Sequence, residues 1–309
     1  MPGIEPGFYI RRSEEKMRDP SRGRVAGSGH DSRLGAIGKR HHRHLSVPPS
    51  SPADTAESPR LEEKLMMSSR SWACPKTTAY PSREAGPPSK TATACRLVFV
   101  VGYTGAFLLH LSPPWLPASG QGAFTMWAYA VLLMLAVGGW GGELAEQGRL
   151  LTAGPLRAVA WLALGAVGAV ALESVGVLAS DWLAGVLPGV GAELANDANV
   201  GRAIVAFPPW AVLGVLVFAG PVVEEMFFRQ FLLTAIADRT RAWVGITVSG
   251  VLFGMLHMHS WTLSEWVGII PHACFGVAAG ILFVRTRGNV LFPAALHVLN
   301  NLSAIAPSL

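Results

Sequence analysis

Residues 203–237 read AIVAFPPWAVLGVLVFAGPVVEEMFFRQFLLTAIA, an apolar stretch that carries two adjacent carboxylates and one guanidinium. The three charged side chains are Glu224, Glu225 and Arg229. An apolar stretch of this length predicts a membrane-spanning helix, and a charge at membrane depth is costly unless it is paired or neutralised. The stretch therefore predicts a helical membrane protein, and the charges inside it indicate a functional site.

Two further polar clusters follow in the C-terminal part of the chain. The segment FGMLH at 253–257 ends one apolar run, and HVLNN at 297–301 lies inside the last one. Three separate hydrophobic segments thus carry acid, imidazole or amide groups. This is the pattern expected of a catalytic centre built inside a helix bundle.

Composition divides the chain into two parts. Residues 1–96 hold 17 of the 25 Lys and Arg residues and 10 of the 20 acidic residues, whereas 97–309 hold 8 and 10. Residues 1–94 are rich in Ser, Pro, Gly, Arg and His and show no apolar periodicity. Such a segment cannot bury enough surface to offset its conformational entropy, so we expect a disordered basic tail. Residues 95–309 are expected to form the membrane-embedded domain.

Two interpretations of the basic tail stay open. It can act as a polybasic segment attracted to anionic lipid, or it can be a solvated leader. The run from His41 to His44 lacks spaced metal-ligating partners. Cys74, Cys95 and Cys274 are too scattered for a disulfide framework or a zinc cluster. We expect the lipid bilayer, and no nucleic acid, as a partner.

Apolar segments and loop charges predict a polytopic all-α bundle of about seven transmembrane helices. Arginines in three of the loops place those loops on the cytoplasmic side and the N-terminus inside. Residues 97–309 contain no Lys and are rich in Ala, Gly, Val and Leu, which is typical of a high-GC prokaryote. We therefore expect a prokaryotic cytoplasmic (inner) membrane protein. The predicted spans are 97–112, 123–141, 156–179, 203–223, 242–258, 266–284 and 289–306.

Prolines are expected to interrupt the long stretch at 203–237. As one helix it would be about 52 Å long, far more than a bilayer core requires. Proline removes a backbone donor and clashes with the preceding turn. Pro208, Pro209 and Pro221 are therefore the predicted breakers.

Helical spacing assigns different tasks to the two glutamates. Residues four apart share a helix face, so Glu225 can pair with Arg229, whereas Glu224 points about 100° away. Glu224 is then an unpaired carboxylate in an apolar segment, which makes it the candidate general base.

The other two polar clusters supply the remaining candidates. His297 and Asn301 are also four apart, so an imidazole and an amide can donate to one developing oxyanion. His257, from a third helix, can help to orient or deprotonate an attacking water. His259 and His272 are interpreted as structural or interfacial.

The ordered motifs Glu224-Glu225-x-x-x-Arg229, Phe253-x-x-x-His257 and His297-x-x-x-Asn301 resemble the signature of the CPBP intramembrane proteases. These are the CAAX prenyl endopeptidase and bacteriocin-processing group, also called the ABI family. The resemblance covers roughly residues 200–305. It implies a metal-independent glutamate protease in which Glu224 and His257 activate water and His297 and Asn301 form the oxyanion hole, with Glu225 and Arg229 as an orienting pair.

Several alternatives accompany this interpretation. Glu224, His257 and His297 can also be regarded as three zinc ligands with an open position for water, giving a zinc-dependent version of the protease. Some proteins of the family are proposed to act in bacteriocin self-immunity by binding a partner. A transporter is less well supported, because the sequence shows no internal repeat. The resemblance implies cleavage near the C-terminus of a membrane-anchored protein or peptide, and the prokaryotic composition favours a non-prenylated substrate.

Overall fold

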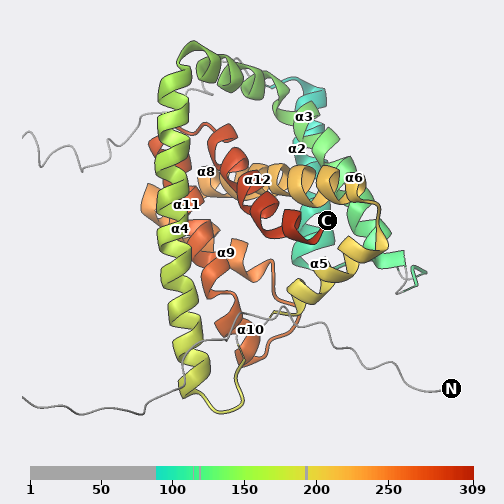
Figure 1. Cartoon of the computed structure of the whole chain (residues 1–309). Coiled ribbons are helices and arrows are strands. Elements are labelled where there is room, and N and C mark those ends of the chain that lie inside the picture. The colour runs from blue at the N-terminus through green and yellow to red at the C-terminus, as the bar shows by residue number, and fades with distance from the viewer. Residues whose placement is uncertain (1–87, 114, 118–119, 192–193) are drawn as a thin grey trace, which may run out of the picture. The chain divides into compact units, whose positions relative to one another are not determined.

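The computed structural model describes residues 88–113, 115–117, 120–191 and 194–309 (Figure 1). The predicted disordered tail lies almost entirely outside the described residues. Every element in the described part of the chain is a helix, so the prediction of an all-α fold is confirmed. In order, the elements are α2 (Lys90–Tyr103), the π-helical η3 (Thr104–Leu108), α3 (Gln121–Ala153), α4 (Pro155–Val186), α5 (Ala195–Ala206), α6 (Pro209–Val212), the π-helical η5 (Leu213–Ala219), α7 (Gly220–Glu225), the π-helical η6 (Met226–Leu233), α8 (Thr234–Ala237), α9 (Ala242–Met255), α10 (Leu263–Gly268), α11 (Ile270–Arg285), α12 (Leu291–Ile305) and the 3-10 turn η7 (Ala306–Ser308).

In the described part of the chain, five helices are long and apolar enough to cross a membrane, and each overlaps one of the predicted spans: Lys90–Leu108, Gln121–Ala153, Pro155–Val186, Pro209–Ala237 and Leu263–Arg285. The other two predicted spans form the shorter helices α9, with 14 residues, and α12, with 15. The first helix begins earlier than its predicted span because Ser89 caps it, its side-chain oxygen accepting from the Ala92 N–H at 3.1 Å.

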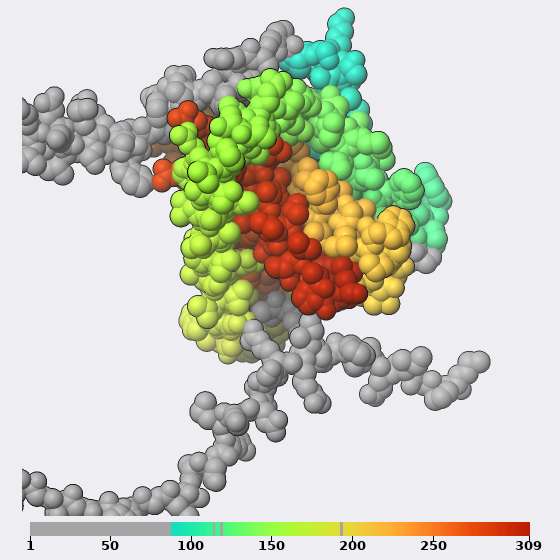
Figure 2. Space-filling view, turned by 45° about the horizontal axis from the view of Figure 1, so that its top comes forward, coloured from blue at the N-terminus to red at the C-terminus, as the bar shows by residue number. Residues whose placement is uncertain are grey.

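The helix that carries the two glutamates is the most buried of the five. In its most apolar window 61% of residues are buried, against 11% for α4. It lies across the middle of the bundle, with α4 along one side and α3 on the other (Figure 1). The space-filling view shows α12 between α4 and the 209–237 helix (Figure 2). Any ionisable group on the inner face of that helix is therefore surrounded by protein.

Close approach of α9 and α11 closes the bundle beside this helix. Gly250 and Gly276 meet where the two helices cross, and a Cβ built on Gly276 would lie 2.8 Å from the Gly250 carbonyl oxygen. Small residues let helix backbones pack this tightly in a membrane, where packing contacts replace the hydrophobic driving force. This crossing positions Phe253, on α9, against the centre of the bundle.

Only part of the predicted proline breakage occurs. The chain is extended at Phe207 and Pro208, which separates α5 from the helix beginning at Pro209. Pro221 was wrongly predicted to break the helix, which continues without interruption from Pro209 to Ala237. The reason is the π-helical segment before it. The Gly220 N–H bonds to Val215 O, five residues back. In the same π-helical pattern the next N–H would bond to Leu216 O, and Pro221 occupies that position without an N–H.

Candidate active site

Both glutamates lie on α7, the short segment between the π-helical segments η5 and η6. Glu224 is 7% exposed and Glu225 is fully buried. π-helical turns inside α-helices are frequent at functional sites, because they re-aim side chains and free backbone groups. Here they bracket the two carboxylates on either side.

Glu225 is the centre of an ion-pair network. Its Oε2 lies 3.0 Å from Arg229 Nε, and both side chains are 0% exposed. The alignment of these two atoms does not meet hydrogen-bond geometry, so the contact is an ion pair. Arg229 Nη2 also donates to the carbonyl of Gly276 at 3.0 Å, and the guanidinium lies over the ring of Phe253. The pair expected from the four-residue spacing therefore ties the 209–237 helix to α9 and α11.

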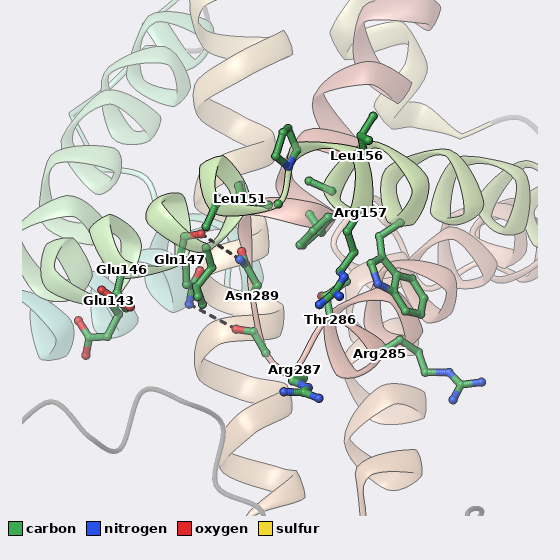
Figure 3. A pocket seen from close by; sticks show the side chains of 18 of the residues that line it. Glu143, Glu146, Gln147, Leu151, Leu156, Arg157, Arg285, Thr286, Arg287 and Asn289 are labelled. Carbon is green, nitrogen blue, oxygen red and sulfur yellow. Dashed lines mark hydrogen bonds between the residues drawn. The ribbon is translucent and has the colours of Figure 1, made fainter.

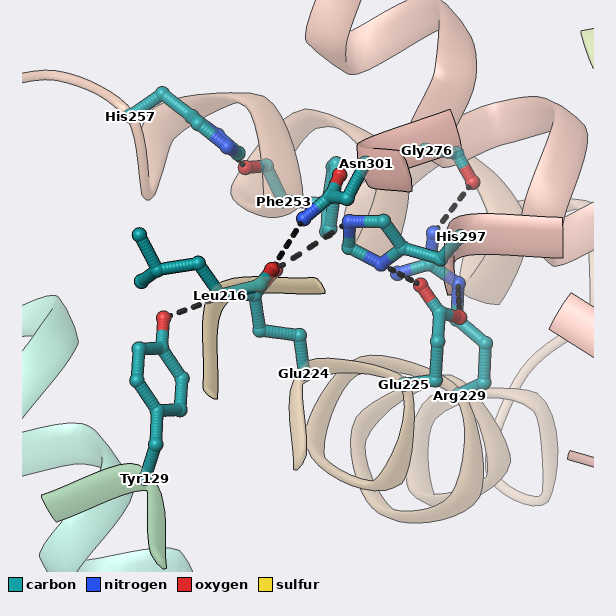
Figure 4. A network of polar contacts seen from close by, with 10 residues as sticks. All are labelled: Tyr129, Leu216, Glu224, Glu225, Arg229, Phe253, His257, Gly276, His297 and Asn301. Carbon is teal, nitrogen blue, oxygen red and sulfur yellow. Dashed lines mark hydrogen bonds and ion pairs between the residues drawn. The ribbon is translucent and has the colours of Figure 1, made fainter. Parts of the chain in front are cut away.

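Glu224 points to a different side of the helix and has different partners (Figure 4). Tyr129, on α3, donates its hydroxyl to Glu224 Oε1 at 2.7 Å. The second oxygen, Oε2, lies 3.8 Å from His297 Nε2, which is beyond hydrogen-bond distance. One carboxylate oxygen is thus fixed, and the other faces an imidazole across a short gap.

His297 lies between the two glutamates. Its Nδ1 is 3.2 Å from Glu225 Oε1, while its Nε2 faces Glu224. An ionised carboxylate only accepts hydrogen bonds, so the contact with Glu225 places a hydrogen on Nδ1. Donation from Nε2 as well requires the imidazolium form. The proton on Nε2 is therefore the one whose presence decides whether His297 can act as an oxyanion donor.

Asn301 faces the same helix from α12, four residues after His297 (Figure 4). Its Nδ2 donates to Leu216 O at 2.9 Å. Pro221 lies five residues after Leu216 and has no N–H to donate to that carbonyl. An amide nitrogen carries two hydrogens, so this bond leaves a second N–H. The proline that does not break the helix thus supplies the anchor that orients Asn301.

His257 is the predicted site residue that stands furthest from the others. It follows the end of α9, and its Nδ1 lies 3.1 Å from Phe253 O. No direct hydrogen bond joins it to Glu224 among the described residues. The Phe253 ring contacts both imidazoles, with centroids 5.4 Å from His257 and 5.3 Å from His297. The structure therefore brings Glu224, His297 and Asn301 together and places His257 beside them, around one phenyl ring.

Three residues that lie near the candidate site were not assigned to it by the sequence analysis. Tyr129 has no motif relation to Glu224, being 95 residues away in the sequence. His272, interpreted as structural, stacks on His257 with ring centroids 4.2 Å apart, and its buried Nδ1 has no hydrogen-bond partner in the described part of the chain. Glu173, an acid inside the long apolar helix α4, interacts electrostatically with His297. Of these three residues, Glu173 alone could have been found from the sequence, because it is a charged residue within a predicted membrane span.

Comparison with known proteins identifies the relationship. Residues 206–303 match the family model described as Type II CAAX prenyl endopeptidase Rce1-like, and this range contains all six predicted site residues. This part of the chain is therefore similar to the CPBP family named in the sequence analysis. A curated relative, "Putative membrane peptidase YdiL" of Bacillus subtilis (strain 168), is 25% identical over 113 residues.

The CPBP resemblance is confined to part of each protein. The YdiL match covers 37% of this chain and 43% of that protein, so the matched region spans less than half of the curated relative. No solved structure matches the chain. Tyr129 and Glu173 lie outside the CPBP match, on α3 and α4. Both therefore belong to the surroundings of the CPBP motifs.

The zinc alternative requires three donors around one point. Among the residues that the structure describes, no group of three His, Cys, Asp or Glu side chains is placed to hold a metal ion. Of the three side chains considered as ligands, Glu224 and His297 face each other, whereas His257 is directed to the Phe253 carbonyl. The three side chains therefore point in different directions in this structure.

Proposed function

We propose that this membrane protein is an intramembrane endopeptidase that hydrolyses a peptide bond near the C-terminus of a membrane-anchored protein or peptide. The observation that carries the proposal is the arrangement of Glu224, fixed by Tyr129 on one oxygen and open toward His297 on the other. A single carboxylate with one free oxygen beside an imidazole has the parts that general-base hydrolysis requires. The match of residues 206–303 to a family model described as a prenyl endopeptidase supports the same reaction class.

In this mechanism, water loses a proton to the free oxygen of Glu224 while its own oxygen attacks the scissile carbonyl carbon. The carbonyl oxygen becomes an oxyanion, which Asn301 and a doubly protonated His297 stabilise by donating hydrogen bonds. The proton then passes to the leaving amide nitrogen as the C–N bond breaks. His257 acts on the water from the far side of Phe253, through a change in position or through a second water.

Glu225 and Arg229 serve as positioning residues in this proposal. The Glu225 carboxylate holds Nδ1 of His297 at 3.2 Å and so aims Nε2 at Glu224. Arg229 fixes Glu225 from the opposite side at 3.0 Å. Because all these groups are deeply buried, their electrostatic interactions act in a medium of low effective dielectric.

The proposed substrate is a non-prenylated membrane protein. The enzyme itself is proposed to lie in a prokaryotic cytoplasmic membrane, with its own N-terminus on the cytoplasmic side. No metal takes part in the proposed mechanism. The prokaryotic composition of residues 97–309 supports the choice of substrate.

The test compares Glu224→Gln with the wild type. Glutamine keeps the shape of the side chain and can still accept from Tyr129, but it cannot take a proton. Comparative proteomics of membrane-protein C-termini, with and without the gene, first identifies a substrate. Cleavage of that substrate by purified Glu224→Gln protein should fall by about 10²- to 10⁴-fold.

Asp181→Asn is the matched control, because it also converts a carboxylate to an amide, but at an exposed position near the C-terminal end of α4. It should cleave at the wild-type rate. Wild-type cleavage by Glu224→Gln would contradict the assignment, and a partner-binding or immunity role would then become the better explanation.

A further inference from the structure

A cavity of about 1330 Å³ lies away from the glutamates, where three membrane spans end (Figure 3). The span of α3 ends at Ala153, that of α4 begins at Pro155, and that of α11 ends at Arg285; all three residues line the cavity. Helix ends of spans lie at the membrane surface, where the phosphate groups of lipids are found. The cavity is therefore within reach of lipid headgroups. We call it the arginine cavity.

The charge of the arginine cavity is positive. Arg157, Arg285 and Arg287 line it together with Glu143 and Glu146. Both acids already have cationic partners outside the lining: Glu143 pairs with Arg96, and Glu146 pairs with Arg149. Arg157 and Arg287 are exposed, and neither has an acidic partner among the described residues. Guanidinium groups left without carboxylates suit a phosphate, which they bind in a bidentate manner.

The backbone adds to this preference. The lining includes Gly154 and the first residues of α4, and no side chain caps that helix. Pro155 has no N–H and the Gly154 N–H bonds to Leu151 O at 3.3 Å, so the amides of Leu156 and Arg157 are the ones in this first turn that have no intrahelical acceptor. Together with the helix dipole they favour an anion. Arg157 stands in the same first turn, so side-chain and backbone donors serve one position.

Buried hydrogen bonds hold the floor of the cavity in place (Figure 3). Gln147, on α3, donates to Gly288 O at 3.3 Å and accepts from the Val290 N–H at 3.0 Å. Asn289 Nδ2 donates to the carbonyl of Gln147 at 3.2 Å. These bonds fix the α11–α12 turn, in which Arg287 adopts a left-handed backbone with φ 60°. The loop that carries Arg287 is therefore pre-organised against α3.

Apolar side chains complete the lining. Leu150 and Leu156 are 51% and 87% exposed, and Trp161 and Phe292 also face the cavity. A free phosphate ion would make no use of them, whereas acyl chains would cover them. We propose that the arginine cavity binds an anionic phospholipid, with its phosphate on Arg157 and Arg287 and its chains along the leucines. The proposal does not depend on the proteolytic function.

The test measures the dissociation constant of phosphatidylglycerol for the purified full-length protein in detergent micelles by native mass spectrometry. The double variant Arg157→Ala/Arg287→Ala should bind phosphatidylglycerol at least about tenfold more weakly, from roughly 1 kcal/mol for each arginine. Arg239→Ala/Arg241→Ala is the matched control. It removes two exposed arginines that lie just before α9 and outside the lining, and should retain wild-type affinity.

Three results would overturn the proposal. Equal weakening by both double variants would show a general surface charge effect. Equal affinity of the wild type for phosphatidylcholine and phosphatidylglycerol would show that the arginines do not select an anion. Displacement of the lipid by millimolar inorganic phosphate would show that the ligand is a free anion. Thermal unfolding of each variant verifies its fold, and Arg157→Lys/Arg287→Lys, which keeps the charges but cannot bind in a bidentate manner, should restore only part of the binding.

Discussion

The buried pair of Glu225 and Arg229 gives the sharpest prediction, because Glu225→Gln should destabilise the wild type but stabilise the Arg229→Met variant. Arg229→Met removes a guanidinium that lies 3.0 Å from Glu225 and donates to Gly276 O. It leaves a fully buried carboxylate whose remaining polar contact, among the described residues, is with His297. Stranding a charge of this kind costs about 3–5 kcal/mol, and the unpaired carbonyl adds about 1–3 kcal/mol.

A second substitution in the same protein should restore stability. Glu225→Gln alone strands the guanidinium and should be destabilising by a similar amount, about 3–5 kcal/mol. In the Arg229→Met background it instead removes the stranded charge. The double variant should therefore lose only the contribution of the Gly276 carbonyl, about 1–3 kcal/mol, and be more stable than Arg229→Met.

The assay is equilibrium unfolding in mixed micelles, followed by far-UV circular dichroism, for the wild type, both single variants and the double variant. Arg241→Met, an exposed arginine before α9, is the control for loss of one positive charge and should stay within about 0.5 kcal/mol of the wild type. If Glu225→Gln further destabilised the Arg229→Met protein, the two side chains would not form a coupled ion pair. The network around His297 would then need a different explanation.

Three more predictions address the site and the packing around it. Tyr129→Phe keeps the ring but removes the hydrogen bond to Glu224, so kcat for a verified substrate should fall about tenfold with little change in KM. The control is Tyr103→Phe, which should not slow turnover because the buried Tyr103 hydroxyl has no hydrogen-bond partner among the described residues. Equal loss of activity in both variants would contradict the role of Tyr129. Gly276→Ala should destabilise the bundle by about 1–3 kcal/mol, because its Cβ would meet backbone of α9, whereas Gly168→Ala, with open space around it, should be neutral or stabilising in the same unfolding assay. Chelator treatment followed by dialysis should leave proteolysis unchanged, and recovery of lost activity on adding Zn²⁺ would favour the zinc alternative.

The sequence by itself determined the helical membrane class and the contacts made within one helix. Mean apolarity over about 20 residues is a local property, so the spans could be found without knowing their neighbours. The pairing of Glu225 with Arg229 also follows from local geometry, because residues four apart share a helix face. The same spacing places His297 and Asn301 together on α12.

Tertiary structure alone decided which groups from different helices meet. Tyr129 reaches Glu224 across 95 residues of sequence, and no periodicity encodes which turn of α3 faces α7. Pro221 was misjudged because π-helical turns and a side-chain donor on α12 compensate for the missing N–H, and that donor is visible only once α12 is packed in place. The arginine cavity likewise gathers the ends of α3, α4 and α11. Local pattern fixes each helix and its faces, whereas crossing points and rotations between helices depend on side-chain packing over the whole bundle.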